Sequence, residues 1–262
     1  MRTTVGSHHP GNVVLDLDGC LYVEDEAVPG AGDALGALAA AGFRIILATN
    51  NSTKTPEVVA ERVESIVGHA VDPAWVITSA VAARSMLVAG DQPVLTVGEP
   101  GLAATMREWG VAMTDESAAA HTVVVGLDRG FTYDRLRQAS HALLRGARFI
   151  ATNPDATFPT AGLADPGAGS MVAAVAFASG RQPEFAGKPF EPMRRCVAAL
   201  LGPGPTWVVG DRAETDLAFG IPAGWTTVLV MTGVTHDPDG IDPPPDHVLT
   251  SVADLPSVLI QA

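Results

Sequence analysis

Two aspartates separated by one residue, Asp16 and Asp18, stand at the C-terminal end of an apolar segment, 12–17, that is typical of a buried strand. Ligands of open parallel α/β sheets bind beyond the carboxyl ends of the strands. Residues i and i+2 of an extended chain point the same way, so both carboxylates are expected to face one pocket, and Gly19 permits a sharp exit. Two such acids need a cation or a shared proton. Read alone, the pair also fits a polar turn. A calcium loop is disfavoured because Cys20 stands where that loop needs Asp or Asn.

Groups that suit a phosphate follow at two later points of the chain. Thr49 and Asn50 come directly after the next predicted strand, where a hydroxyl and backbone N–H groups can hold phosphoryl oxygens. Lys188, one of only two lysines, precedes Pro189, which keeps its backbone extended ahead of a predicted helix. Taken singly, the first group also fits an ordinary polar loop and the second a solvated surface lysine.

A fourth group, Asp211 and Asp216, lies after a predicted strand at 207–209. Asp211 is either the N-cap of the helix that follows or a hard oxygen ligand for Mg²⁺. Asp216 is expected to hydrogen-bond to a metal-bound water or to Lys188. Each of the four groups is a weak signal alone. Their order, each after a predicted strand, predicts one site at the edge of a sheet.

The elements that position these groups alternate between strand and helix. Strands are predicted at 12–17, 43–48, 207–209 and 226–230, and helices at 31–41, from Thr55 and Pro56 onward, at 213–219 and at 252–260. This alternation predicts an α/β fold whose sheet is mostly parallel, with helices on both faces. The middle of the chain has its own predicted strands (94–97, 122–125, 149–151) and helices (102–109, 133–144, 170–179). We therefore expect a core of residues 1–81 and 184–262 and an inserted α/β domain of residues 82–183.

Composition excludes several classes of function. A formal net charge of −13 argues against a nucleic-acid-binding surface, which needs clustered Lys and Arg. No apolar run reaches the roughly 20 residues that span a bilayer, and the polar residues 1–11 lack the apolar stretch of a secretory signal. The two cysteines, Cys20 and Cys196, predict no disulfide framework. We expect a cytoplasmic protein with neither a nucleic-acid nor a membrane partner.

Together the four groups resemble the motifs of the haloacid dehalogenase superfamily of phosphatases. Within it the chain is similar to the NagD-like branch, which includes nitrophenylphosphatases and phosphoglycolate or glycerol-phosphate phosphatases. The insert resembles that branch at 124–129, 151–155 and 166–170, so the likeness covers nearly the whole chain. Cys20 stands where the family more usually has Thr or Val, and we expect it to lie beside the chemistry without taking part.

The resemblance implies a Rossmann-like core, a cap domain and a role for each site residue. Asp16 is the nucleophile that forms an aspartyl phosphate, and Asp18 is the general acid and base. Mg²⁺ is bound by the Asp16 carboxylate, the Asp18 backbone carbonyl and Asp211, with Asp216 outside the ligand set. The phosphoryl oxygens are bound by Thr49, the Asn50 backbone and Lys188.

The insert is expected to select the substrate, which would be a small phosphorylated metabolite. Asn153, Asp155 and the turn at 167–170 are the candidates for specificity, although the turn fits a helix N-terminus capped by Ser170 somewhat better than direct substrate contact. The resemblance also raises a cap-mediated homodimer as an expectation. Two other functions stay open: a non-catalytic sensor of phosphorylated metabolites and a phosphoprotein phosphatase.

Overall fold

The computed structural model describes residues 10–158 and 164–260, so most of the N-terminal segment considered above lies outside the described residues. The chain divides into two compact units. The first contains Met1–Leu47, Glu64–His69 and Val197–Ala262, and the second contains Ala48–Val63 and Ala70–Cys196. The predicted insert, residues 82–183, falls wholly within the second unit. Its boundaries as a cap stay a prediction.

The first unit is built on parallel strands that neighbour one another in the order β14, β13, β12, β1, β4. Their bounds are β1 Asn12–Leu15, β4 Arg44–Thr49, β12 Thr206–Gly210, β13 Thr226–Val230 and β14 His247–Leu249. Successive side chains of β1, from Val13 to Leu15, are all at most 1% exposed. Adjacent residues point to opposite faces of a sheet, so both faces are covered, as the predicted α/β fold requires. β14 was not predicted, because it is a strand of three residues, two of them exposed, and so lacks a buried apolar run.

The helices of the first unit lie near the predicted positions, but two of the predicted helices are divided into shorter turns. They are α1 Ala31–Ala40, the π-helical turn η3 Ala213–Leu217, α8 Ala218–Gly220, η4 Ile221–Ala223, η5 Val252–Asp254 and α9 Leu255–Leu259. The predicted helix 213–219 is therefore a π turn followed by a short α turn. The predicted helix 252–260 starts as a 3₁₀ turn capped by Ser251, and Pro256 then stands in the first turn of α9. The short hairpin β2 Tyr22–Val23 and β3 Glu26–Ala27 was not predicted.

Two helices contain residues of both units, and their sequence signals are those expected. α2 spans Pro56–Val67 and begins at the proline that was predicted to open it. α7 spans Glu191–Ala198 and follows the Lys188 segment. Two unit boundaries therefore fall within these helices and a third falls within β4, so the division reflects compactness and not linkers in the sequence.

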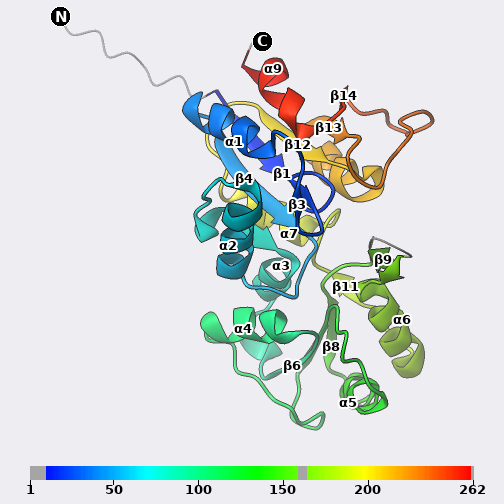
Figure 1. Cartoon of the computed structure of the whole chain (residues 1–262). Coiled ribbons are helices and arrows are strands. Elements are labelled where there is room, and N and C mark those ends of the chain that lie inside the picture. The colour runs from blue at the N-terminus through cyan, green and yellow to red at the C-terminus, as the bar shows by residue number, and fades with distance from the viewer. Residues whose placement is uncertain (1–9, 159–163, 261–262) are drawn as a thin grey trace, which may run out of the picture. The chain divides into compact units, whose positions relative to one another are not determined.

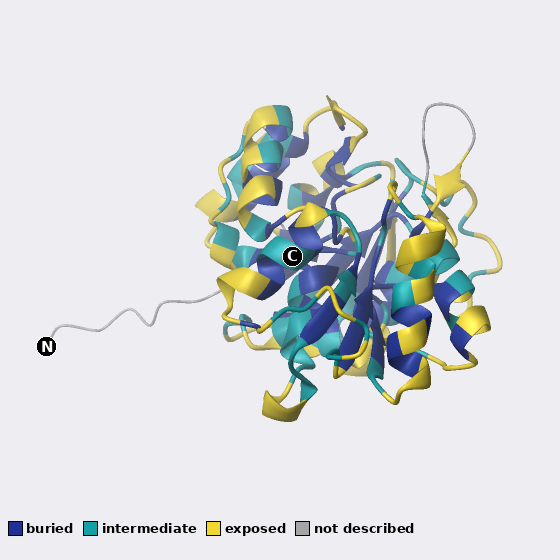
Figure 2. Cartoon of the chain, turned by 90° about the horizontal axis from the view of Figure 1, so that it is seen from below, coloured by how far each residue is buried: buried dark blue, intermediate teal, exposed yellow. Residues whose placement is uncertain are grey.

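The second unit has a sheet of its own with the strand order β11, β8, β7, β6, again parallel throughout. Alternate residues of β7, Val123 and Val125, pack in one core with residues of α5 and α6, while Val124 is equally buried on the other face. Figure 1 labels β6, β8, β11, α5 and α6, and Figure 2 shows strands in the dark blue of buried residues and helices with yellow exposed faces. The elements of this unit are β5 Val76–Thr78, α3 Ser79–Ser85, β6 Val94–Val97, α4 Pro100–Glu108, β7 Thr122–Val125, α5 Tyr133–Leu144, β8 Arg148–Ala151, β9 Thr157–Phe158, β10 Asp165–Pro166, α6 Ala168–Ser179 and β11 Glu184–Phe185, with 3₁₀ turns η1 Pro73–Trp75 and η2 Ala89–Asp91.

A charged cluster around Arg148 ties together distant parts of the second unit. Its Nε and Nη2 atoms donate to the two carboxylate oxygens of Glu184 at 2.8 Å each. Its Nη1 atom donates to Asp91 Oδ2 and to the carbonyl of Met86, both at 2.8 Å. The hydrogen bonds from Arg148 hold the pKa of Glu184 below its usual value. The cluster joins the start of β8 to β11 and to the segment after α3.

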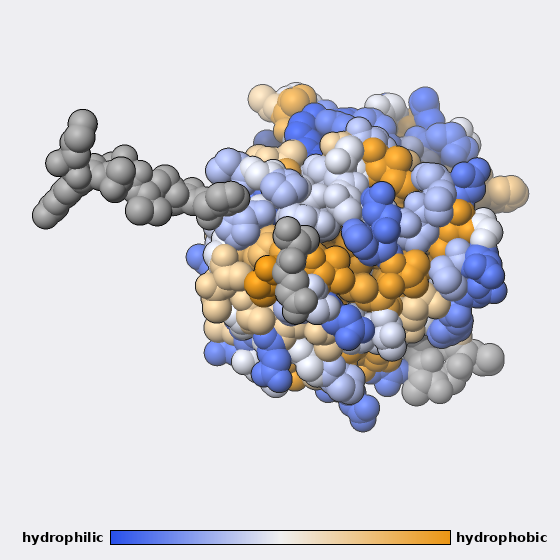
Figure 3. Space-filling view, turned by 90° about the horizontal axis from the view of Figure 1, so that it is seen from above, coloured by the Kyte–Doolittle hydropathy of each residue, from blue (hydrophilic) through white to orange (hydrophobic). Residues whose placement is uncertain are grey.

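Among the described residues, no helix is long and apolar enough to cross a bilayer. Figure 3 shows apolar side chains in patches between hydrophilic ones on the face that it presents. Apolar side chains of this kind are common on protein surfaces and do not by themselves indicate a partner.

Candidate active site

Three carboxylates of the first unit converge: Asp16, Asp211 and Asp216 each offer an oxygen, and these atoms all lie within 4.8 Å of one another. Asp16 follows β1 and Asp211 follows β12, and these strands are parallel neighbours with Leu15 in register with Val209. The convergence therefore results from two adjacent strands ending at the same sheet edge. Asp211 and Asp216 are 4% and 2% exposed.

The carboxylate of Asp211 is oriented by the loop after β13. Val234 N donates to its Oδ2 atom at 2.6 Å, and Thr235 N donates to its backbone carbonyl at 3.1 Å. The helical turn that follows has Arg212 as its N-cap, with no side-chain capping bond. The alternative reading of Asp211 as a helix N-cap is therefore wrong, and its side chain belongs to the carboxylate cluster.

Glycines allow the chain to pass close to Asp211. Gly19 has φ of +85°, and a Cβ atom there would lie 2.5 Å from Asp211 Oδ2. A Cβ atom on Gly233 would lie 2.5 Å from Asp211 Cγ. Thr232 Oγ1 donates to the carbonyl of Gly19 at 2.6 Å and so connects the two segments. The sharp exit predicted at Gly19 is thus confirmed, and Gly233, in the loop after β13, likewise allows a close approach to Asp211.

Asp216 was predicted to lie outside a metal ligand set, yet its carboxylate is a member of the cluster. Its Oδ2 atom accepts a hydrogen bond of 3.1 Å from Arg212 N, which fixes the side chain across the turn. Three like charges this close repel one another unless a cation is shared. Hard oxygen ligands suit Mg²⁺, so the residues present fit this ion.

Asp18 and Cys20 lie in the turn after β1. The side chain of Asp18 is exposed and is not a member of the carboxylate cluster, while Cys20 is fully buried. The turn is closed by hydrogen bonds from Gly19 N to Tyr22 O at 2.8 Å and from Cys20 N to Leu17 O at 3.1 Å. An exposed acid on a well-defined turn is accessible to a proton donor or acceptor, which is what the predicted role of Asp18 needs.

The predicted phosphate-binding residues lie in the second unit, where Asn50 and Lys188 are in direct contact. Asn50 Oδ1 accepts from Lys188 N at 2.7 Å, and Asn50 Nδ2 donates to Lys188 O at 3.1 Å. Lys188 is only 3% exposed, so it is not a solvated surface lysine. Thr49 is 2% exposed, and its hydroxyl oxygen accepts from Asn51 N at 3.0 Å.

The candidates for specificity, Asn153 and Asp155, bind Asn50 in the same unit. Asn153 Nδ2 donates to the carbonyl of Asn50 at 2.8 Å, and Asp155 Oδ2 accepts from Asn50 Nδ2 at 3.1 Å. Asn153 Oδ1 accepts from Asp155 N at 3.1 Å. Sequence reasoning did not anticipate this side-chain role of Asn50, nor that of Ser79, whose hydroxyl donates to Asn50 O at 2.6 Å. No motif marks Ser79, because it begins a helix that the sequence pattern did not reveal.

The turn at 167–170 is a helix N-terminus, but its cap is not Ser170. Helix α6 begins at Ala168 with Gly167 as N-cap, and Ser170 Oγ donates to Ala156 O at 2.8 Å. Gly169 N donates to Asp155 O at 2.8 Å, so the turn holds the 153–156 loop in place. The prediction of Ser170 as cap is wrong because the close approach of this loop requires glycine at the helix start.

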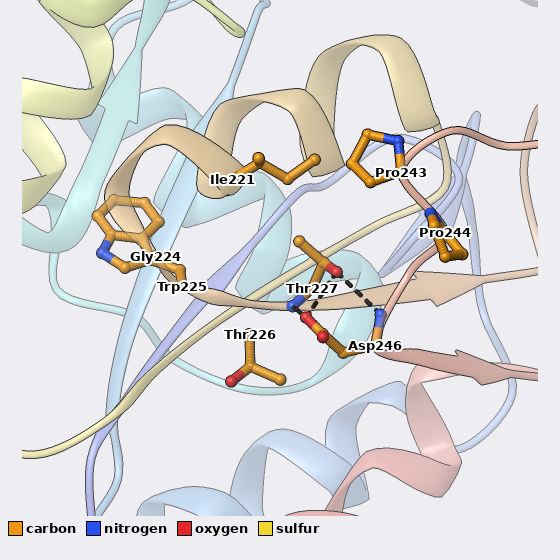
Figure 4. A pocket seen from close by; sticks show the side chains of 8 residues that line it. All are labelled: Ile221, Gly224, Trp225, Thr226, Thr227, Pro243, Pro244 and Asp246. Carbon is orange, nitrogen blue, oxygen red and sulfur yellow. Dashed lines mark hydrogen bonds between the residues drawn. The ribbon is translucent and has the colours of Figure 1, made fainter.

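A cavity of about 360 Å³ in the first unit contains none of the predicted site residues. Figure 4 shows its lining, which includes Trp225, Pro243 and Pro244. Its acid, Asp246, accepts from both the N–H and the hydroxyl of Thr227, at 2.8 and 2.9 Å. These hydrogen bonds hold the pKa of Asp246 below its usual value, and they fasten the proline-rich loop to β13.

Comparison with known proteins identifies relatives along nearly the whole sequence. The family model described as haloacid dehalogenase-like hydrolase matches residues 13–112, and a second, HAD-hydrolase-like model matches residues 185–255. The dihydroxyacetone phosphatase of Corynebacterium glutamicum (strain R) is 35% identical over 246 residues, which are 92% of this chain and 88% of the relative.

Two solved structures are similar over most of their length. NagD from the E. coli K-12 strain has a TM-score of 0.83 and 32% identity, covering 93% of this chain and 97% of that one. The glycerol phosphate phosphatase of Mycobacterium tuberculosis, solved in complex with magnesium, has a TM-score of 0.83 and 30% identity. This second likeness covers 93% of the present chain and 75% of the other.

Proposed function

Since the chain belongs to the haloacid dehalogenase-like hydrolases, in their NagD-like branch of phosphatases, we propose that it hydrolyses small phosphate monoesters through an aspartyl phosphate on Asp16. One observation carries the proposal: Asp16, Asp211 and Asp216 place their oxygens within 4.8 Å of one another beyond parallel strands. A protein that only senses a phosphate ester has no need of a nucleophile beside two further acids. The phosphatase activity itself agrees with the named activities of the relatives.

The first half of the reaction transfers the phosphoryl group. A carboxylate oxygen of Asp16 forms a bond to phosphorus while the bond from phosphorus to the ester oxygen breaks. Asp18 donates its proton to the departing oxygen, which leaves as an alcohol. The exposed position of Asp18 on its turn supports this role, because an exposed acid can reach the leaving oxygens of esters that differ in size.

The second half hydrolyses the intermediate. The Asp18 carboxylate, now deprotonated, takes a proton from water, and the water oxygen attacks phosphorus as the bond to Asp16 breaks. Inorganic phosphate is released, and both side chains return to their starting states. The Thr49 hydroxyl, the Asn50 backbone and Lys188 are proposed to bind the phosphoryl oxygens; losing one such contact is expected to cost about 3 kcal/mol by comparison with oxyanion donors.

Asp16, the Asp18 backbone carbonyl and Asp211 would hold Mg²⁺, and the position of Asp216 makes it a further candidate ligand. When bound, Mg²⁺ supplies positive charge that offsets the repulsion between an anionic substrate and the carboxylates. The magnesium complex of the mycobacterial relative supports the choice of ion.

The experiment that tests the proposal is turnover of nitrophenyl phosphate by the purified protein with Mg²⁺ and after removal of divalent ions by a chelator. We expect Mg²⁺-dependent release of nitrophenol. Binding of phosphate esters without turnover would favour a sensor instead. A panel of phosphorylated metabolites and a phosphopeptide, ranked by kcat/KM, would then identify the substrate class, with the phosphopeptide testing the phosphoprotein alternative. The relatives' names make dihydroxyacetone phosphate and glycerol phosphate the first compounds to include.

A further inference from the structure

The side chain of Asn50 binds both polar backbone groups of Lys188. Lys188 N can only donate and Lys188 O can only accept, so the first must face Asn50 Oδ1 and the second Asn50 Nδ2, at 2.7 and 3.1 Å. A carboxamide has an acceptor oxygen and a donor nitrogen on a single planar group, and neither Asp nor Leu at this position would reproduce both bonds. The backbone of a lysine that is 3% exposed is therefore fixed by one side chain.

The same side chain also reaches the 153–155 loop. Its amide nitrogen has a second hydrogen, and Asp155 Oδ2 accepts from this nitrogen at 3.1 Å. The backbone carbonyl of Asn50 accepts from Asn153 Nδ2 at 2.8 Å and from Ser79 Oγ at 2.6 Å. Asn153 is 4% exposed, and its Oδ1 atom accepts from Asp155 N at 3.1 Å. Its side-chain amide therefore links the 153–155 loop to Asn50.

Close approach makes this arrangement possible. Gly187 precedes Lys188, and a Cβ atom on it would meet the Asn50 amide oxygen and would lie 2.6 Å from Thr152 O. Gly187 N donates to Thr152 O at 2.7 Å, which continues the β11 to β8 connection up to Lys188. Asn50, Lys188 and the 153–155 loop thus form one hydrogen-bonded assembly within the second unit.

We propose that the Asn50 side chain is a positioning residue: it holds Lys188 for phosphoryl binding and couples it to the loop that contains Asn153 and Asp155. This inference rests on the proposed function of Lys188. It also changes the expected role of Asn153, which supports the loop through Asn50 and does not contact the substrate.

A double-mutant cycle tests the connection to Lys188. Asn50→Asp keeps the shape and the acceptor but replaces the donor, and a misplacement of about 1 Å can lower the rate about 100-fold. We expect kcat for nitrophenyl phosphate to fall about 10- to 100-fold, with a smaller change in KM. In a Lys188→Met background, the same substitution should change kcat less than about twofold, because residues that act as a unit are not additive. Equal losses in both backgrounds would overturn the proposal.

The exchanged pair Asn50→Asp with Asp155→Asn tests the connection to the loop. It restores an amide next to a carboxylate and removes the repulsion between two acids, so it should turn over faster than Asn50→Asp alone. A double variant as slow as the single one would exclude Asp155 from the proposal. Gln182→Glu, the same chemical change on an exposed side chain of this unit, is the matched control and should retain wild-type kinetics.

Thermal unfolding of each variant separates positioning from loss of structure. Asn50→Asp should melt close to the wild type, and a variant that does not fold would contradict a role limited to Lys188 and the loop. If Lys188→Met keeps wild-type kcat, the phosphate-binding role in the proposed function fails and the inference fails with it. If Lys188→Met is impaired but Asn50→Asp is not, only the inference fails.

Discussion

The backbone N–H of Val234 donates a 2.6 Å hydrogen bond to the Oδ2 atom of Asp211. The donor belongs to the loop after β13, whereas Asp211 follows the neighbouring strand β12. The orientation of the carboxylate therefore depends on a backbone group of another segment, and no charged side chain of that segment makes the contact. At Gly233, just before Val234, a side chain would have no room between the loop and this carboxylate.

Gly233→Ala is expected to weaken Mg²⁺ binding without removing any ligand. The new methyl group would lie 2.5 Å from Asp211 Cγ, so either the carboxylate or the loop must move. Loss of groups that orient metal ligands typically costs about 10- to 100-fold in metal affinity. The measurement is the Mg²⁺ concentration that gives half-maximal turnover of nitrophenyl phosphate.

Gly36→Ala is the matched control, because a Cβ atom at Gly36 in α1 meets nothing within 4 Å. It should leave the magnesium titration unchanged. An unchanged titration for Gly233→Ala as well would show that the loop does not orient Asp211.

Asp16→Asn should abolish turnover and leave the fold intact. The amide cannot form the aspartyl phosphate, and loss of a covalent nucleophile has cost about 10⁶-fold in kcat in a well-studied protease. We expect activity below the detection limit, while the thermal midpoint stays the same or rises because one of three close negative charges is removed. Asp33→Asn, an exposed acid in the first turn of α1, is the control. Near-normal activity of Asp16→Asn would exclude Asp16 as nucleophile.

The sequence predicted the carboxylate cluster in part, because Asp16 and Asp211 both follow apolar strands. Parallel strands end at one edge, and this rule alone was enough to bring Asp16 and Asp211 together. The same rule could not tell a ligand from a helix cap at Asp211, because that depends on a hydrogen bond from Val234, which is distant in sequence. Asp216 was expected outside the ligand set, as a hydrogen-bond partner of a metal-bound water or of Lys188, and the rule for strand ends does not apply to it, because it lies in a π turn.

Similar limits apply in the second unit. The strands at 94–97 and 122–125 and the helix at 133–144 were predicted with their observed bounds, because each is a strongly patterned segment. The side-chain role of Asn50 could not be predicted, since its partners Lys188 and Asp155 are more than 100 residues away along the chain. The cytoplasmic location, the homodimer and the roles of the individual site residues stay predictions.

Glu184 is expected to contribute stability that depends on pH. Its pKa is lowered in the folded protein because Arg148 donates hydrogen bonds to it. A carboxyl group with a lowered folded pKa stabilises the fold fully above its unfolded pKa, near 4.5, and this contribution is lost as the pH falls through the folded pKa. Glu184→Gln should therefore lower the midpoint of denaturant unfolding at pH 7, and the difference from wild type should shrink below pH 4.5.

Because the Glu184 side chain is 54% exposed, solvent screens the ion pair and the effect is expected to be small. Glu191→Gln is a suitable control, since its pair with Arg195 is longer, at 3.6 Å, and similarly exposed. A Glu184→Gln variant with the wild-type midpoint at every pH would show that the cluster around Arg148 does not stabilise the unit.

Gly169→Ala should change substrate preference through the 153–156 loop. A Cβ atom there would lie 2.6 Å from the carbonyl carbon of Pro154 and 2.8 Å from Asp155 O, so the loop must shift. If that loop selects the substrate, the ratio of kcat/KM between a large and a small phosphate ester should change. A change of about 1 kcal/mol in the difference between their transition-state binding energies would change this ratio about fivefold. Gly90→Ala, where a Cβ atom meets nothing within 4 Å, should leave the ratio unchanged. An equal loss of kcat/KM for all substrates would instead indicate that the loop acts by positioning Lys188 through Asn50, because every ester needs its phosphoryl group bound.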